Sequence, residues 1–295
     1  MTPDTARLRI VFAALLFSTG GAGIKLSVLT GPQVACLRSG VAAVTVLLLL
    51  PSSRRGWRRS TLVIGATYAA TMILFVLANK LTTAASTIYL QAVSPLYLLL
   101  LGPWLLREPV RRRDLMFMAA MAAGMALFFI GSGRTFQTAP DPVRGNLLAA
   151  LSGFCWALTV TGLRWAALGE SRADGGGSVE ALVVAGNALA FFACLPMALP
   201  LPAMGPIDWT VILYLGALQI GLAYILLARA MRQVHALDAS LLLLVEPVLN
   251  PIWAWLIHAE APGPWALLGG AIILAATAAR TLLAARRGGE PSGVA

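Results

Sequence analysis

Charged residues are scarce in this sequence. Only 12% of its 295 residues are Asp, Glu, Lys or Arg, against about 25% in an ordinary soluble domain. Hydrophobic residues make up 59% of the chain, and the mean hydropathy is +0.81. The formal net charge is +10, but the arginines stand in short loops between apolar runs, without a basic arm or interleaved aromatic residues. The composition therefore predicts an integral protein of a lipid bilayer and no nucleic-acid partner.

The residues that hold metals or carry out catalysis are also few. The chain has three cysteines and two histidines. Cys36, Cys155 and Cys194 fall within apolar stretches, at spacings that match no metal site or redox pair. No HExxH motif and no phosphate-binding GxxxxGK[ST] loop occurs. We therefore predict no catalytic residues, no metal, no cofactor and no direct coupling to ATP. An intramembrane enzyme is the least favoured interpretation.

Ten apolar stretches of helix length follow one another along the chain. Each is long enough to cross a hydrocarbon core of about 30 Å, and Pro, Gly or Arg clusters separate them. The first could be a signal peptide because Arg7 and Arg9 precede it, but its match to the sixth stretch favours a retained helix. The predicted spans cover residues 8–29, 32–51, 61–80, 84–106, 114–132, 145–168, 179–200, 208–231, 237–257 and 264–284.

The basic residues predict the orientation of these spans. Arg38 and Arg164 lie deep within spans and are not counted. Of the other lysines and arginines, which stand in loops or near span ends, sixteen fall on the side that holds both termini. The four on the other side are Lys25, Lys80, Arg134 and Arg144. By the positive-inside rule, we predict a multi-pass protein of the cytoplasmic (inner) membrane with both termini in the cytoplasm. Residues 288–295 would form a disordered cytoplasmic tail.

An internal repeat divides the chain into two halves. A shift of 152 residues superposes Ser94-Pro95 on Glu246-Pro247, and in each half a glutamate, Glu108 or Glu260, follows the proline by thirteen residues. Earlier in each half, a shift of 139 pairs Phe17 with Trp156 and Lys25 with Arg164. Because five spans are an odd number, the second half would enter the membrane from the opposite side. We therefore predict an all-α protein whose ten transmembrane helices form two inverted five-helix repeats, residues 1–138 and 139–287, around a central cavity. This architecture is typical of alternating-access transporters.

The ninth stretch contains an acid next to prolines. Glu246 lies nine residues past Leu237, about 14 Å along a helix and therefore close to the bilayer midplane. Pro247 and Pro251 cannot donate backbone hydrogen bonds and interrupt the helix around this acid. Polar groups at this depth persist only where protein or a water-filled cavity satisfies them. We therefore predict a substrate site at Glu246, with Pro95, Pro247 and Pro251 as hinges.

Helical spacing brings other polar and aromatic side chains toward this acid. The carboxylate or free backbone carbonyls could hold an ammonium group, while amides or hydroxyls meet a carboxylate, and aromatic walls accept a bulky apolar side chain. The predicted partner is thus a small-molecule zwitterion. The predicted substrate-binding residues are Glu246, Asn250, Trp253, Gln91, Ser94, Tyr68, Met72, Phe75, Asn79, Gln219, Tyr224 and Arg38.

Each of these residues also has a structural interpretation. Glu246 could be a protonated acid that faces lipid or a neighbouring helix, and Asn250 and Gln91 could join helices. Trp253 could pack or contact lipid. Arg38 could reach the interface with its long side chain, or act as a gate or carboxylate partner. Lys25 and Arg164 are predicted to be interfacial anchors.

Several proline and charged residues occur in the order found in a known transporter family. They are Pro32 and Arg38 in the second span, Ser94-Pro95 with Glu108, and Glu246-Pro247 with Glu260. In this order, which covers nearly the whole chain, the sequence resembles the EamA-type ten-helix proteins of the drug/metabolite transporter superfamily. The run from Ala228 to Met231, followed by Leu237 to Pro251, is similar to the branch that exports aromatic and other amino acids.

The resemblance implies a basket of ten helices around a cavity lined mainly by spans 1, 3, 4, 6, 8 and 9. It also implies a secondary transporter that exports amino acids, aromatic and other neutral ones, or related small metabolites. The alternative is a proton-coupled multidrug exporter in which Glu246 alternates between a proton and a cationic drug. Proton coupling is thus possible, and the sequence does not indicate an oligomeric state.

Overall fold

The computed structural model describes residues 3–105, 112–130, 137–170, 179–231, 234 and 236–288. Within these residues every regular element is a helix. In the part of the chain that the structure describes, nine helical segments are long and apolar enough to cross a membrane, and Asp114–Ile130 adds a shorter apolar helix. These ten segments coincide with the ten predicted stretches, which confirms an all-helical multi-pass membrane protein. Glu108 and the tail beyond Gly288 lie outside the described residues.

Nine α-helices and one 3₁₀ turn precede the eighth span in the described residues. In the first five spans these are α1 (Pro3–Ser18), α2 (Gly20–Leu26), α3 (Gly31–Leu49), the 3₁₀ turn η1 (Pro51–Arg54), α4 (Arg59–Leu81), α5 (Ala84–Gln91), α6 (Ser94–Leu105) and α7 (Arg112–Ile130). The sixth and seventh spans are α8 (Pro142–Glu170) and α9 (Val179–Ala198).

Of the last three spans, the eighth and ninth are less regular. The eighth consists of α10 (Pro206–Leu213), a π-helix η2 (Tyr214–Leu222) and α11 (Ala223–Met231). The ninth consists of α12 (Ala236–Leu243) and α13 (Val245–His258), and the tenth is α14 (Pro264–Gly288). A π-helix of this length is rare, and such segments are frequent at functional sites.

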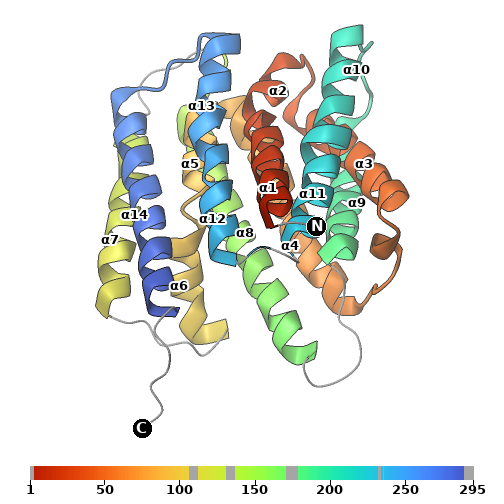
Figure 1. Cartoon of the computed structure of the whole chain (residues 1–295). Coiled ribbons are helices and arrows are strands. Elements are labelled where there is room, and N and C mark those ends of the chain that lie inside the picture. The colour runs from red at the N-terminus through yellow and green to blue at the C-terminus, as the bar shows by residue number, and fades with distance from the viewer. Residues whose placement is uncertain are drawn as a thin grey trace.

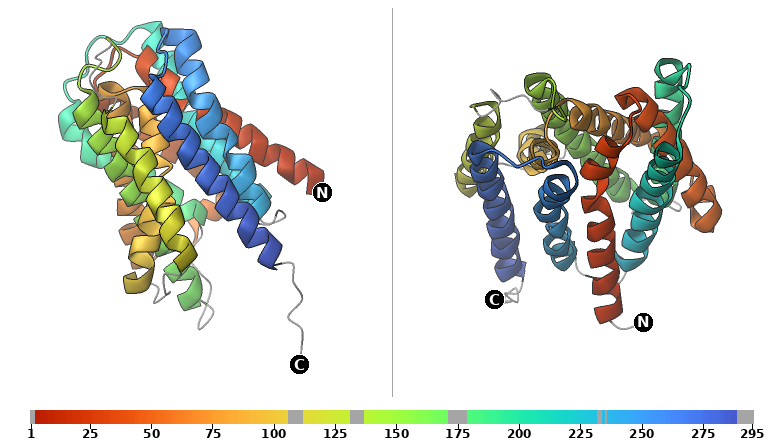
Figure 2. Two further views of the ribbon diagram at one scale, coloured as in Figure 1. Left: turned by 90° about the vertical axis from the view of Figure 1, so that its left-hand side faces the viewer. Right: turned by 90° about the horizontal axis from the view of Figure 1, so that it is seen from above.

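The helices form two groups with a central set between them (Figure 1). On one side α3 packs against α4, α9 and η2, and α4 packs against α8. On the other side α7 packs against α14, and α6 packs against α8. Helix α1 contacts α11, α12 and α13 in the middle of the bundle, and the view from above in Figure 2 shows the same order. The interior between the two groups is therefore lined by the broken helices.

The fourth and ninth spans break at corresponding positions. Helix α5 ends at Gln91 and α12 ends at Leu243, which are 152 residues apart, the same shift that superposes the two sequence halves. Pro95 and Pro247 lie in the first turn of α6 and α13, where a missing backbone N–H leaves no hydrogen bond unmade. The helices therefore stop before these prolines and restart with them, whereas Pro251 lies inside α13 and is buried.

One end of the bundle is closed around Lys25. Its Nζ lies 3.0 Å from Oε2 of Glu260, and the two side chains are only 2% and 1% exposed. Lys25 also donates to the carbonyl oxygens of Thr82, at 2.8 Å, and Thr138. Oε1 of Glu260 accepts a hydrogen bond from the backbone N–H of Ala84 at 2.6 Å. We call this end of the bundle the Lys25 end.

Lys25 is therefore not the interfacial anchor that its position near a span end predicted. The segments after α4, α7 and α13 fold over its ammonium group and supply an acid and two carbonyl oxygens. Nearby, Lys80 donates to the carbonyl oxygen of Ser27 at 2.7 Å, and the Ser27 hydroxyl donates to Asp208 at 2.8 Å. Helices of both halves are thus joined by charged groups at this end. The side chain of Arg164 lies outside what the structure describes.

Candidate substrate cavity

A cavity of about 360 Å³ lies among the broken helices. Its size is that of a pocket for a small molecule. All six predicted spans, 1, 3, 4, 6, 8 and 9, contribute to it, and spans 2 and 10 add Arg38 and Thr277. The lining residues are Phe17, Arg38, Met72, Phe75, Gln91, Ala92, Ser94, Pro95, Trp156, Gln219, Ile220, Tyr224, Leu227, Leu243, Leu244, Glu246, Leu274 and Thr277.

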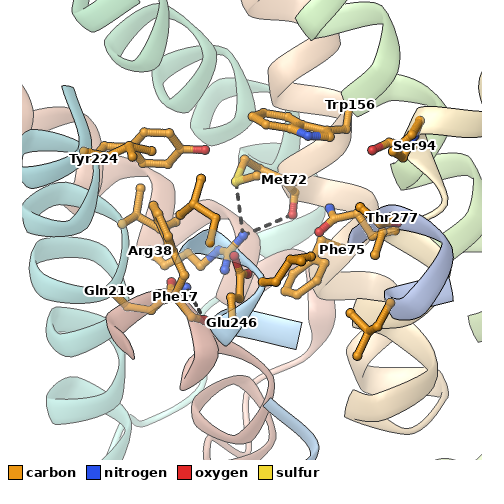
Figure 3. A pocket seen from close by; sticks show the side chains of 18 residues that line it. Phe17, Arg38, Met72, Phe75, Ser94, Trp156, Gln219, Tyr224, Glu246 and Thr277 are labelled. Atoms are coloured by element: carbon orange, nitrogen blue, oxygen red, sulfur yellow. Dashed lines mark hydrogen bonds between the residues drawn. The ribbon is translucent and has the colours of Figure 1, made fainter. Parts of the chain in front are cut away.

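Glu246 lines this cavity from the first turn of α13 (Figure 3). The break at Leu244 places it next to the N-terminus of a new helix, where the helix dipole favours a carboxylate. Its side chain is partly exposed. Within the described part of the chain, no hydrogen bond or ion pair engages the carboxylate. The acid is therefore available to a solute in the cavity.

Arg38 enters the same cavity from α3 and is 1% exposed. Its Nη2 donates to the carbonyl oxygen of Met72 at 3.2 Å and lies 3.7 Å from the Met72 sulfur. Its Nε has no hydrogen-bond partner among the described residues. No acid in those residues forms an ion pair with the guanidinium. Burial of an unpaired charge costs free energy. The contacts with Met72 offset only part of the desolvation cost of this cation.

Four aromatic rings form a continuous wall beside these two charges. Phe17 contacts Tyr224 with ring centroids 5.0 Å apart, and Tyr224 contacts Tyr68 at 5.8 Å. Tyr68 in turn lies 6.4 Å from Trp156. Edge and tilted contacts of this kind stabilise the rings in fixed positions. The wall offers an apolar surface to a solute whose charged groups meet Glu246 or Arg38.

A second cavity of about 490 Å³ lies on the other side of this wall. Trp156, Tyr224, Leu227 and Leu243 line both cavities. The remaining lining is mostly aliphatic, and Leu50 and Val179 place it near the end of α3 and the start of α9. Helix α3 begins at Gly31, at the Lys25 end, and runs away from that end to Leu49. The second cavity therefore lies at the end of the bundle opposite the Lys25 end. The hollow part of the bundle therefore extends away from the closed end.

Polar groups complete the lining. Gln91 donates to the Ser152 hydroxyl at 2.9 Å, and Ser152 donates to the carbonyl oxygen of Thr71 at 3.1 Å. Gln219 lies in the π-helix η2 and donates to the carbonyl oxygen of Phe17 at 3.3 Å. Its Oε1 has no partner in the described part of the chain. The side-chain NH₂ groups of Gln91 and Gln219 are thus held by protein contacts, and the Gln219 oxygen remains as an acceptor for a solute.

The structure brings eight of the twelve predicted binding residues into the central cavity: Arg38, Met72, Phe75, Gln91, Ser94, Gln219, Tyr224 and Glu246. Of the predicted hinges, Pro95 also lines it. The other four binding residues lie nearby but do not line it. Tyr68 faces the second cavity, while Asn79, Asn250 and Trp253 pack toward the Lys25 end. A role of these four residues in substrate binding stays a prediction.

Asn250 and Trp253 point away from the cavity because α13, after its own first turn, packs against the first span. Trp253 donates from its indole N–H to the Ser18 hydroxyl at 2.9 Å. Asn250 and Asn79 are completely buried on either side of Gly21. A Cβ at Gly21 would lie 2.7 Å from Oδ1 of Asn250 and 3.1 Å from Oδ1 of Asn79. Only glycine allows this close approach of the helices.

Sequence reasoning missed several lining residues. Phe17, Trp156, Leu274 and Thr277 all line the central cavity, although none was among the predicted contacts. The shift of 139 residues pairs Phe17 with Trp156, so equivalence in the two halves was a signal for these rings. The hydroxyl of Thr277 is satisfied by the carbonyl oxygen of Ile273 at 2.8 Å, and no sequence pattern distinguishes it from other threonines of the spans.

The helices define a class of protein, a multi-pass membrane protein. Residues 143–281 match the model of the EamA-like transporter family. This match supports the drug/metabolite transporter superfamily and indicates a membrane transporter of small solutes. The family is one of transporters, which is consistent with the prediction that the chain is not an enzyme.

A comparison with curated proteins found no match. A solved structure described only as "Crystal structure of protein" is similar over 97% of this chain and 99% of its own, with a TM-score of 0.61 and 22% sequence identity. At this level of identity the similarity concerns the fold alone. It supports the arrangement of helices along the whole chain, including the first half, which lies outside the family match.

Proposed function

We propose that the protein is a secondary transporter that exports amino acids, aromatic and other neutral ones, or closely related metabolites across the cytoplasmic membrane. The observation that carries this proposal is Glu246, an acid without a protein partner among the described residues, in a cavity with an aromatic wall. An ammonium group would meet the carboxylate, and a bulky side chain would lie against the rings.

We further propose that transport occurs by alternating access between two inverted repeats. In favour of this, the breaks in the fourth and ninth spans are 152 residues apart, as the repeat in the sequence requires, and half-helices beside a midplane site are common in such transporters. The Lys25 end is closed by the Lys25–Glu260 ion pair, and the cavities extend the other way. Release on the outer side would require this closed end to part.

The function is tested by counterflow of radiolabelled phenylalanine in liposomes that contain the purified full-length protein. We expect wild-type protein to support counterflow and Glu246→Gln to weaken it with normal expression, because the substitution keeps the shape and removes the charge. Asp141→Asn is the matched control, since that acid forms an exposed ion pair with Arg144. Counterflow by Glu246→Gln at the wild-type rate would contradict the role of this acid.

Proton coupling is distinguished by the same variant. If Glu246 carries a coupling proton without binding the ammonium group, transport driven by a pH gradient should fail in Glu246→Gln while counterflow survives. A purely structural acid would instead lower the yield of folded protein. Uptake measured with and without a pH gradient separates these cases.

A proton-coupled multidrug exporter is the second candidate. The observation that favours it is the second cavity, whose mostly apolar lining adjoins Glu246 across the aromatic wall and suits a lipophilic cation. Uptake of a cationic dye that requires a pH gradient, without counterflow of any amino acid, would establish this function instead.

A further inference from the structure

Arg38 is a buried cation that the proposed role of Glu246 leaves unexplained. It lies in the middle of α3, and its guanidinium group reaches the central cavity (Figure 3). Only the carbonyl oxygen and the sulfur of Met72 contact it as hydrogen-bond acceptors within the described residues. A guanidinium group carries five N–H donors, so most of its hydrogen-bonding capacity is open.

The position of Arg38 is fixed by close packing of the backbone around it. Gly216 of η2 approaches α3 so closely that an added Cβ would lie 2.7 Å from the Arg38 carbonyl oxygen and 2.5 Å from Cβ of Val41. Helix α3 therefore cannot move toward η2 to withdraw the arginine. The hydrogen bond to the Met72 carbonyl oxygen orients the side chain toward α4.

An interfacial role does not fit this location. Arg38 is 1% exposed, whereas an arginine that reaches the interface keeps its charged group in water. A role as a structural ion pair does not fit either, because no acid of the described chain is its partner. The remaining function of a cation in this cavity is to bind an anionic group that enters with the solute.

We propose that Arg38 binds the carboxylate of the transported solute, so that the site selects zwitterions and rejects cations. This proposal rests on the proposed function and names its substrate class. A carboxylate accepts two parallel N–H donors from one guanidinium group, a geometry that a lysine cannot provide. The solute would lie with its carboxylate at Arg38, its ammonium group at Glu246 and its side chain against Phe17 and Tyr224.

The same charge disfavours the alternative substrate class. A lipophilic cation in this cavity would meet the attraction of Glu246 and the repulsion of Arg38 at similar depth, in a region where charges interact strongly. A zwitterion gains from both groups. Arg38 therefore allows the site to discriminate between amino acids and cationic drugs. Glu246 alone would attract both.

The test compares solutes that differ only in their charged groups. Liposomes with the full-length protein are loaded with phenylalanine, and counterflow of radiolabelled phenylalanine is competed with unlabelled phenylalanine, phenethylamine or 3-phenylpropionate. Phenethylamine lacks the carboxylate and 3-phenylpropionate lacks the ammonium group. In the wild type we expect phenethylamine to compete at least about tenfold less well than phenylalanine, the factor expected for loss of a charged hydrogen bond.

Arg38→Gln should abolish this discrimination, so that phenethylamine competes as well as phenylalanine or better. Arg38→Lys keeps the charge and should retain an intermediate preference. The matched control is Arg144→Gln, because the Arg144 side chain is 80% exposed and remote from the cavity; its competition ratio should equal that of the wild type. Size-exclusion profiles in detergent establish that each variant is folded.

Equal competition by phenylalanine and phenethylamine in the wild type would overturn the role of Arg38 while the proposed function stands. That measurement needs no variant, so it decides the matter even where Arg38→Gln does not fold. If no amino acid supports counterflow, the proposed function fails, and thermal stabilisation by 3-phenylpropionate then tests Arg38 separately. Equal stabilisation of the wild type and Arg144→Gln that is reduced in Arg38→Lys supports the anion site, and no stabilisation of the wild type overturns it.

Discussion

At the level of single residues, the central cavity holds two opposite charges that do not neutralise each other by direct contact. Arg38 and Glu246 line the same space, yet no ion pair joins them. Direct pairing would satisfy both groups and close the site to a solute. Their separation leaves each one available for the opposite charge of a zwitterion, and the contact between the rings of Phe17 and Tyr224 fixes the wall beside them.

The aromatic lining should determine which side chains the transporter accepts. Phe75→Ala enlarges the central cavity, because Phe75 lines it and is otherwise buried. We expect the ratio of tryptophan to alanine counterflow to change by severalfold, since an aromatic contact contributes about 0.5–1.5 kcal/mol beyond area burial. Trp255→Ala is the control, because that ring is 57% exposed on α13. An equal loss for every amino acid would indicate a folding defect.

Removal of one partner of the buried Lys25–Glu260 ion pair should lower the stability of the protein. Lys25→Met leaves Glu260 as an unpaired buried charge, which costs about 3–5 kcal/mol, and we expect a clear drop in melting temperature in detergent. The double variant Lys25→Met/Glu260→Gln should recover part of this loss, because it leaves no charge behind. Arg144→Gln, which removes an exposed pair, should change stability by at most about 1 kcal/mol. Equal melting temperatures for Lys25→Met and the wild type would contradict this assignment.

Residue placement was only partly predictable from the sequence. Spacing in a regular helix puts Glu246, Asn250 and Trp253 on one face, but the break at Leu244 and the contact of α13 with the first span separate them. Trp253 therefore reaches Ser18 instead of the cavity. The sequence also did not predict that Lys25 is buried, because its partners come from three distant segments. Such contacts depend on tertiary packing, which periodicity along one helix does not contain.

At the level of helices, the sequence located the spans well and their internal irregularities only in part. Hydropathy and helix length predicted all ten apolar segments to within a few residues at most ends. Proline indicated the breaks of the fourth and ninth spans, although the prolines follow the breaks and begin the next helix. The π-helix η2 has no such marker, because a shift from one hydrogen-bond register to another changes neither composition nor hydropathy.

The contact of η2 with α3 gives a prediction at this level. In Gly216→Ala the new Cβ would lie 2.5 Å from Cβ of Val41, so the π-helix or α3 must shift. Overpacking of this kind costs about 1–3 kcal/mol, and we expect a lower melting temperature together with weaker phenylalanine counterflow, because Arg38 lies at the contact. Gly263→Ala is the matched control, since nothing lies within 4 Å of its added Cβ. Identical behaviour of the two variants would show that this contact is not limiting.

At the level of the whole molecule, one end is closed by charged groups, and the cavities extend from the centre toward the other end. Lys25, Glu260, Lys80 and Asp208 gather at the closed end, although sequence counts assigned few basic residues to that side. A buried ion pair gives little net stability relative to its hydrated charges. The closed end could therefore part at a moderate cost once water reaches the pair, as alternating access requires.

The orientation of the bundle is the last prediction, and it rests on both the charge bias and the geometry. Helix α3 has 19 residues, about 28 Å at 1.5 Å per residue, so the segments at its two ends lie on opposite surfaces of the bilayer. Arg55 follows the far end of α3 and is exposed, whereas Gln137 is exposed next to Thr138 at the Lys25 end. The sixteen-to-four bias of basic residues predicts that Arg55 lies on the cytoplasmic side.

Single cysteines test this orientation in a variant whose Cys36, Cys155 and Cys194 are replaced by alanine. A membrane-impermeant maleimide added to intact cells should label Gln137→Cys and leave Arg55→Cys unlabelled until the membrane is opened. The reverse pattern would show that the basic residues face outward and that the closed Lys25 end faces the cytoplasm, which would reverse the proposed direction of access. Labelling of both positions from one side would contradict α3 as a membrane span, and with it the pairing of the two five-helix halves.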